Sequence, residues 1–284
     1  MLKRGPHYRC TAVFRGDNIP VGYHDSEPED ENMTVELYAF DCGQLSMPAE
    51  TFLEGEEGTM KVPVPAFLIK HPKGNVLFDS GLHDKLRTDP LGYFGEDLNA
   101  MVEVHYRGDE AIEACLESID VGVSNVSHLV NSHLHFDHCG GNCKITDAPV
   151  VIQKKEWEWA TKSEPDLGYY ASDYQTGQDI KTVQGEFDIF GDNSVVCLPT
   201  YGHTPGHQSL RVRTERGEFV LTGDACYLRR TLEELHMPGV LFDREDAIAS
   251  LHRIRALQSR GAQIVYGHDP ELWPGIVKAP ERMG

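Results

Sequence analysis

HLHFDH, at residues 133–138, places four potential metal ligands within six residues of this chain: His133, His135, Asp137 and His138. Such side chains repel one another when charged and gain little from packing in a core, whereas neutral imidazole and carboxylate are good zinc ligands. Residues 126–132, which precede the stretch, are mostly strand-like, and Cys139-Gly140-Gly141 follows it. The pattern therefore predicts metal ligands where a strand ends and a loop begins.

Three later segments carry polar residues at similar places. GHTPGH at 202–207 is a turn that contains His203, TGDA at 222–225 follows an apolar run and contains Asp224, and GHD at 267–269 contains His268. Loops that follow strands can bring side chains together from distant parts of a chain. These segments therefore predict that one site is shared by four loops.

In this order the motifs resemble the metallo-β-lactamase superfamily, from about Thr34 to the C-terminus, with FDSG at 78–81 as a further matching piece. The resemblance implies an α+β fold, an αββα sandwich of two mixed β-sheets with helices on the outer faces. No linker divides residues 34–284, so we expect a single catalytic domain there. Residues 1–33 precede the matching region and contain the acidic run DSEPEDE, which is typical of a flexible, solvated extension.

The resemblance also implies a centre of two divalent metal ions. One ion would be held by His133, His135 and His203. The second would be held by Asp137, His138 and His268, with Asp224 bridging the pair. Such a centre lowers the pKa of a bridging water and makes hydroxide available as a nucleophile. Zinc is the expected metal, and cobalt, manganese and iron also suit these ligands.

Single residues argue against several branches of the superfamily. The common zinc β-lactamases place a cysteine near the bridging position, where this chain has Asp224, and the flavodiiron proteins have a carboxylate where this chain has His135. The nucleases usually append a nucleic-acid-binding domain, for which this chain has no room. With 26 Lys+Arg against 45 Asp+Glu, the formal net charge of -19 also repels phosphate backbones. We therefore expect no nucleic-acid partner.

DACY at 224–227 is most similar to the corresponding motif of the N-acyl homoserine lactone lactonases, the quorum-quenching enzymes, and of relatives that open simple γ-butyrolactones. In these lactonases a tyrosine three residues after the bridging aspartate points at the substrate carbonyl oxygen, and Tyr227 occupies that place. The resemblance implies that hydroxide attacks the lactone carbonyl, that Tyr227 donates a hydrogen bond to the oxyanion, and that Asp137 passes the proton to the leaving alkoxide. Candidate substrate contacts, with core packing as the alternative, are Phe136, Met237 and Gly239.

Two other interpretations remain open from the sequence. One is a hydrolase of the same fold that acts on γ-butyrolactone, pyridoxolactone or a glutathione thioester. The other is a metal-binding or ligand-sensing protein without enzymatic activity. The complete ligand set and Tyr227 favour an enzyme, because a degenerate scaffold has usually lost part of its site.

The bulk composition is typical of a soluble enzyme, and the resemblance implies a small-molecule lactone as its substrate. Hydrophobic residues make up 40% of the 284 residues, which argues against global disorder. No apolar run approaches the roughly 18 residues that span a membrane, and no apolar stretch follows the basic N-terminal residues as in a secretory signal. The seven cysteines show no disulfide framework. We therefore expect a cytoplasmic protein with no membrane partner, and a homodimer is the candidate assembly.

Apolar patterning predicts strands that alternate with helices. The expected strands are 35–40, 65–69, 75–78, 149–152, 194–198, 208–212 and 219–221. Pro72-Lys73-Gly74 indicates a hairpin between the second and third of these. Helices are expected at 110–119, from 154 to about 160, and from Asp243 as a cap to about Ser259.

Overall fold

The computed structural model describes residues 34–162 and 168–284, so the acidic extension predicted at 1–33 lies outside the described residues. The described part belongs to one unit, Met33–Gly284. Its strands are β1 (Glu36–Pro48), β2 (Thr59–His71), β3 (Gly74–Phe78), β4 (Glu103–His105), β5 (Val126–Val130), β6 (Val150–Gln153), β7 (Ile180–Val183), β8 (Phe187–Asp188), β9 (Val195–Pro199), β10 (Gln208–Thr214), β11 (Gly217–Leu221) and β12 (Gln263–Val265). Its α-helices are α1 (Pro90–Asn99), α2 (Ile112–Glu117), α3 (Phe136–Cys139), α4 (Lys154–Lys162), α5 (Ala171–Tyr174), α6 (Arg229–Glu234) and α7 (Arg244–Gln258).

The strands form two mixed sheets. The first sheet has the order β4-β1-β2-β3-β5-β6-β7 and the second has the order β12-β11-β10-β9-β8. In the first sheet β1 to β4 pair antiparallel, whereas β3, β5, β6 and β7 pair parallel. In the second sheet only β11 and β12 pair parallel. The predicted mixed character of both sheets is confirmed.

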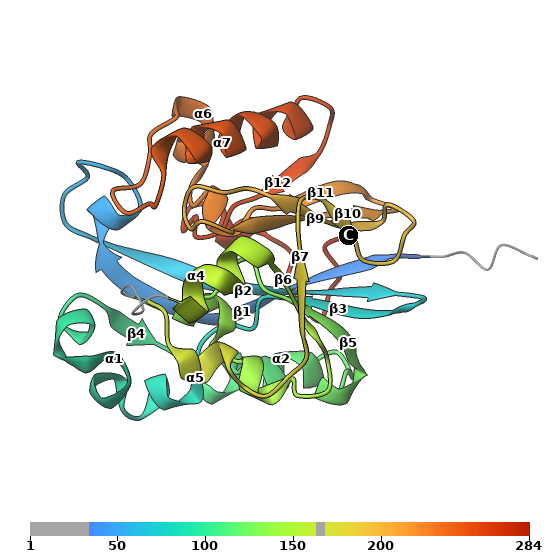
Figure 1. Ribbon diagram of the computed structural model, residues 1–284, viewed down its shortest axis with the longest axis horizontal. Coiled ribbons are helices and arrows are strands. Elements are labelled where there is room, and N and C mark those ends of the chain that lie inside the picture. The colour runs from blue at the N-terminus through green and yellow to red at the C-terminus, as the bar shows by residue number, and fades with distance from the viewer. Residues whose placement is uncertain (1–33, 163–167) are drawn as a thin grey trace, which may run out of the picture. The chain divides into compact units, whose positions relative to one another are not determined.

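Alternation of side chains along the strands produces four layers. In β1, Leu37 and Ala39 pack between the two sheets, whereas Tyr38 and Phe40 pack on the opposite face among residues of the helical layer. This division follows from the two-residue period of a strand, which sends successive side chains to opposite faces. Helices α1, α2 and α5 cover the first sheet and α6 and α7 cover the second, so the predicted αββα sandwich is confirmed (Figure 1).

Local sequence signals correctly predicted a hairpin turn and the start of a helix. His71 pairs with Gly74, so Pro72 and Lys73 form the predicted hairpin turn. The Asp243 side chain accepts a hydrogen bond from Asp246 N at the start of α7, which is the expected cap.

The helix expected at 110–119 is shorter than predicted. α2 spans Ile112–Glu117 and is followed by Asp120, whose positive φ of 57° turns the chain out of the helix. Val121 N then donates to Leu116 O, which satisfies one of the carbonyl groups at the helix end.

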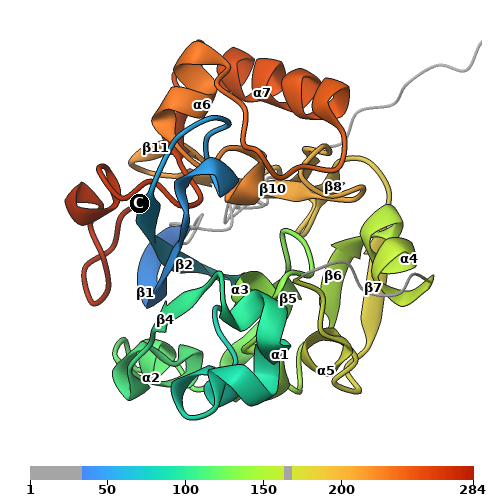
Figure 2. The same ribbon diagram turned by 90° about the vertical axis from the view of Figure 1, so that its left-hand side faces the viewer.

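The loops after β5, β9, β11 and β12 meet at one edge of the two sheets. Figure 2 turns this edge toward the viewer, with α3 near the middle. The edge therefore collects the four motifs that the sequence indicates as parts of one site. None of the helices in the described ranges is both long and apolar enough to cross a membrane.

Candidate metal centre

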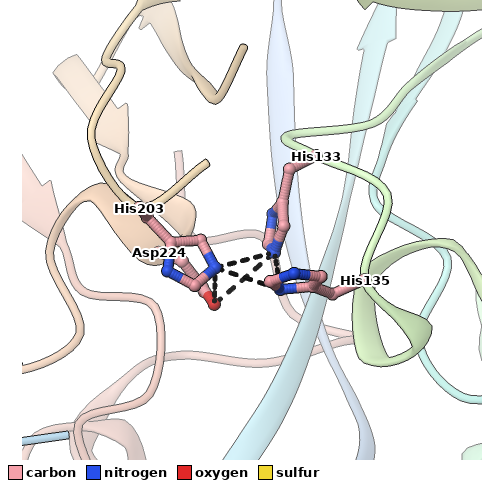
Figure 3. A group of neighbouring side chains, drawn as sticks. All are labelled: His133, His135, His203 and Asp224. Carbon is pink, nitrogen blue, oxygen red and sulfur yellow. Dashed lines mark hydrogen bonds and ion pairs between the residues drawn. The ribbon is translucent and has the colours of Figure 1, made fainter. Parts of the chain in front are cut away.

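Seven side chains converge at this edge in two groups whose donor atoms lie within 4.8 Å of one another. The first group is His133, His135, His203 and Asp224, shown in Figure 3. The second group is Asp137, His138 and His268. The structure thus brings together every residue that the sequence predicted as a ligand. Metal binding by these residues remains a prediction.

The first group presents ring nitrogens to one another at short distances. His133 Nε2 lies 2.9 Å from His135 Nδ1 and 3.1 Å from His203 Nε2, and the latter two nitrogens are 3.1 Å apart. A neutral imidazole carries one N–H, so three converging nitrogens cannot all be satisfied by hydrogen bonds to one another. Tetrahedral zinc, with Zn–N distances of about 2.0–2.1 Å, spaces its ligands at about 3.4 Å. Small outward shifts would therefore fit the group to an ion.

Asp224 lies between the two groups. Its Oδ2 is 3.3 Å from His203 Nε2 and 3.7 Å from His133 Nε2. Its Oδ1 is 3.1 Å from His138 Nε2 and 3.0 Å from His268 Nε2. One carboxylate oxygen therefore faces each group, which is the placement that a bridging ligand requires.

Two polar atoms at the centre fit a bound cation. His138 Nε2 and Asp224 Oδ1 are fully buried and face each other at 3.1 Å, but within the described part of the chain neither has a partner in hydrogen-bond geometry. A buried polar atom without a partner costs about 1–3 kcal/mol. Coordination of a metal would satisfy both atoms, so the donor set suits the ions that the sequence pattern implies.

Two imidazoles of the first group, His133 and His203, are held neutral. Burial, together with the neighbouring histidines, lowers the pKa of His133 well below its usual range. Burial likewise outweighs the Asp224 carboxylate and lowers the pKa of His203 well below its usual range. Because a metal binds the neutral form of imidazole, these rings are ready to act as ligands at neutral pH.

Nearby carboxylates control the charge of the His138 imidazole in the second group. Burial acts to lower the pKa of His138, but the charges of Asp224, Asp137 and Asp79 outweigh it and raise that pKa well above its usual range. Burial acts to raise the pKa of Asp224, but the surrounding histidines hold it well below its usual range. The Asp224 carboxylate is therefore ionised, and it adds negative charge where a cation would sit.

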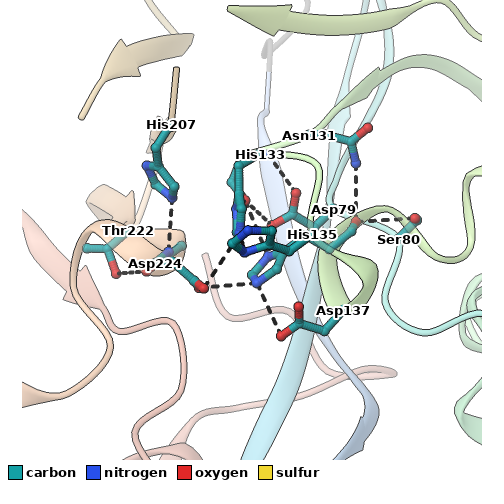
Figure 4. A network of polar contacts seen from close by, with 12 residues as sticks. Asp79, Ser80, Asn131, His133, His135, Asp137, His207, Thr222 and Asp224 are labelled. Atoms are coloured by element: carbon teal, nitrogen blue, oxygen red, sulfur yellow. Dashed lines mark hydrogen bonds and ion pairs between the residues drawn. The ribbon is translucent and has the colours of Figure 1, made fainter. Parts of the chain in front are cut away.

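His207 orients Asp224 through the backbone. Asp224 N donates to His207 Nε2 at 3.0 Å (Figure 4). His207 Nδ1 lies 2.9 Å from Thr200 Oγ1. Burial lowers the pKa of His207 to about 3, so the ring is neutral and can accept at Nε2. A Cβ on Gly223, whose φ is 52°, would lie only 2.9 Å from His207 Nε2. The sequence assigned His207 no role, although its place in GHTPGH was the available signal.

Further hydrogen bonds set the ring orientation in the second group. His268 Nδ1 lies 2.7 Å from Pro63 O, and His138 Nδ1 lies 2.8 Å from Asp79 Oδ2. Each contact directs Nε2 toward the centre, as partners of metal-bound histidines usually do. Asp79 also accepts from Ser132 N at 2.7 Å. Asp79 is the aspartate of the FDSG turn, which the sequence singled out without a role.

Comparison with known proteins agrees with this arrangement. The family model described as Metallo-beta-lactamase superfamily matches residues 60–268. The chain belongs to this superfamily.

Named relatives within the superfamily are N-acyl homoserine lactonases. The chain is 34% identical to N-acyl homoserine lactonase AttM of Azorhizobium caulinodans, over 87% of this chain and 97% of that protein. It is 30% identical to an N-acyl homoserine lactonase of a Bacillus species, over 88% of this chain and 99% of the relative. A solved structure of an N-acyl homoserine lactone hydrolase, with the product N-hexanoyl-L-homoserine bound at its catalytic metal centre, matches with a TM-score of 0.80 and 27% identity. That match covers 88% of this chain and 99% of the other.

In this superfamily member a cavity of about 180 Å³ opens beside the two ligand groups. Its apolar wall consists of Met47, Pro48, Phe52, Leu98, Met101, Phe136 and Val240. Phe136 was predicted to contact substrate and does line the cavity. Met237 instead is 2% exposed and packs in a hydrophobic cluster, and Gly239 N donates to Glu50 O. Neither of these two residues lines the cavity, whereas the adjoining Val240 does.

Tyr227 lines the same cavity and contacts the first group. Its hydroxyl lies 3.1 Å from His203 Nδ1, and its ring packs edge-on against Phe52. With a metal on His203 Nε2, Nδ1 would carry the proton and donate to the tyrosine oxygen. Burial and the Asp224 carboxylate raise the pKa of Tyr227 well above its usual range, so the hydroxyl keeps its proton at neutral pH.

Proposed function

We propose that this protein hydrolyses the lactone ring of N-acyl homoserine lactones at a centre of two divalent metal ions. One observation carries the proposal: the Asp224 carboxylate directs one oxygen to each ligand group. The Tyr227 hydroxyl contacts His203 of the first group. The named N-acyl homoserine lactonases, which match almost over their full length, support the same substrate class.

The metal we propose is zinc. Histidine-rich groups with short nitrogen separations suit its tetrahedral preference. When bound, the two ions would polarise the lactone carbonyl and supply a water whose pKa is near neutral.

Tyr227 and Asp137 would assist the ring opening. The Tyr227 hydroxyl donates a hydrogen bond to the lactone carbonyl oxygen, and this bond strengthens as negative charge develops there. Asp137 lines the cavity, and its Oδ2 lies 3.6 Å from His268 Nε2. From that place its carboxylate can accept the proton of the attacking water and return it to the alkoxide that leaves the ring.

The cavity favours an acylated lactone over plain γ-butyrolactone. Its side chains next to the centre are mostly apolar, including Met47, Leu98 and Met101. An acyl chain would bury against these residues, whereas γ-butyrolactone has no group to fill that wall. The formal net charge of -19 also suits a neutral substrate. We propose that residues 34–284 carry out this reaction as one catalytic domain.

Proton release during lactone hydrolysis tests the proposal directly. Zinc-loaded protein would be mixed with N-hexanoyl- and N-dodecanoyl-homoserine lactone and, separately, with γ-butyrolactone. We expect turnover of the acylated lactones that is lost on chelation. Turnover of γ-butyrolactone alone would move the assignment to a simple lactonase. No turnover of any lactone by protein that holds two zinc ions would contradict the substrate class.

A further inference from the structure

Glu156, near the start of α4, is a fully buried carboxylate beneath the centre. Its two oxygens accept four hydrogen bonds. Oε1 accepts from Leu134 N at 3.1 Å and from the Tyr169 hydroxyl at 2.7 Å. Oε2 accepts from the Thr204 hydroxyl at 2.7 Å and from Gly206 N at 3.1 Å. Each oxygen therefore accepts two hydrogen bonds, and all four partners are donors.

The donors to Glu156 adjoin the ligands of the first group. Leu134 directly precedes His135, and Thr204 directly follows His203. The ring of Tyr169 packs edge-on against the His135 imidazole, with 4.6 Å between ring centroids. One carboxylate thus ties together three segments that hold or contact the first ligand group.

The GHTPGH turn lies directly on the start of α4. A Cβ on Gly206 would lie 2.1 Å from Glu156 N and 2.5 Å from Glu156 Cα, closer than any side chain tolerates. Glycine is therefore required for this approach, and the approach brings Gly206 N within reach of the carboxylate. The position of Glu156 is fixed by the backbone as well as by its hydrogen bonds.

The second group is anchored by different contacts. His138 Nδ1 bonds to Asp79, and His268 Nδ1 bonds to the Pro63 carbonyl. None of the four donors to Glu156 is next to either histidine in the chain. The Ser132 hydroxyl contacts a histidine of each group, but the Glu156 hydrogen bonds serve the segments of the first group and the Asp79 and Pro63 contacts serve the second.

We infer that Glu156 is a positioning residue for the first ligand group. By fixing His135 relative to His203, it sets the metal affinity of that group and leaves the affinity of the second group unchanged. The inference rests on the proposed metal centre but not on the proposed substrate. Glutamine at this position would turn its NH₂ toward two of the four donors and leave them unsatisfied, although it has nearly the same shape as glutamate.

Zinc binding to metal-free protein, measured by competition with a chelator, tests the inference one group at a time. The His268→Ala variant keeps the first group intact, and the His203→Ala variant keeps the second. Loss of an outer partner of a metal ligand typically costs about 10–100-fold in affinity. We expect Glu156→Gln to weaken zinc binding by that factor in the His268→Ala background. In the His203→Ala background we expect a change of less than about 3-fold.

Asp173→Asn provides the matched control. Asp173 is also a fully buried carboxylate, and it bonds to the Tyr93 hydroxyl rather than to the ligand loops. Zinc affinity in both backgrounds should be the same with and without this substitution. Unchanged affinity of the first group in Glu156→Gln would overturn the inference, and so would an equal loss in both groups.

Single-donor variants keep the test decisive if Glu156→Gln does not fold. Tyr169→Phe and Thr204→Val each remove one hydrogen bond to Glu156 while preserving the size of the side chain. Each should weaken zinc binding at the first group only, and no effect from either variant would overturn the inference. Wild-type protein that binds no zinc would contradict the metal centre and the inference with it. Because turnover is not measured, a wrong substrate would leave the result unchanged.

Discussion

Asp224 and Asp173 are both buried carboxylates, and their pKa values move in opposite directions. Asp224 is 5% exposed, and the histidines around it hold its pKa well below the usual range. Asp173 is 0% exposed, and burial raises its pKa to about 7, because its hydrogen-bond partners Tyr93 and Ser172 are neutral. Burial therefore does not decide the charge of a carboxylate in this protein. Neighbouring histidines keep the Asp224 carboxylate charged, whereas the hydrogen-bond partners of Asp173 carry no charge that could do so.

Removing Asp224 should have the largest effect. Asp224→Ala takes away the carboxylate that faces both groups, so we expect loss of metal from both and a fall in turnover on the order of 10³-fold or more, since bound metal lowers the pKa of water from about 16 to about 7. Elemental analysis of the purified variant gives the metal content, and proton release gives the rate. Full metal content in Asp224→Ala would contradict the bridging placement.

Zinc should stabilise the folded protein through the same carboxylate. At free zinc about 1,000 times the dissociation constant, we expect the free energy of unfolding to rise by about 4 kcal/mol. Urea unfolding with and without zinc measures the gain. Asp173→Asn should keep it and Asp224→Ala should lose most of it. Equal gains in the two variants would mean that the two carboxylates do not differ in the way proposed.

Tyr227→Phe separates catalysis from metal binding at the same edge. The hydroxyl contacts His203 from the cavity side, and its loss should lower kcat by about 10²–10³-fold, the usual effect of removing an oxyanion donor. Metal content should stay at the wild-type value because no ligand is lost. Wild-type kcat in this variant would exclude a role for Tyr227 at the carbonyl oxygen.

The smallest effect should come from Asp173. A raised carboxyl pKa stabilises the folded state most below about pH 4, and this contribution is lost as the pH rises through about 7. Between pH 5 and pH 8 the loss should be about 2–3 kcal/mol, at 1.36 kcal/mol for each pKa unit. Asp173→Asn should remove this part of the pH dependence, as measured by urea unfolding at both pH values. The same pH dependence in the variant would assign it to other groups.

Several elements were predictable because their signals are local. The Asp243 cap fixes the start of α7, and Pro72 and Lys73 fix the hairpin turn. α1 was not predicted, although Leu98 and Met101 from this part of the chain line the cavity. Gly95, with a positive φ of 75°, interrupts α1, so its apolar residues do not follow one continuous helical spacing.

The sequence by itself determined the chemistry of the site: which residues can bind a metal, in what order, and that each follows a strand. These properties depend on residue type and on short spacings such as HLHFDH, so they can be recognised in the amino-acid sequence. Only the tertiary structure decided which oxygen of Asp224 faces which group, and that Glu156, Asp79 and His207 support the centre. Those contacts join residues that are far apart in the chain, and they exist because two separately patterned sheets pack face to face.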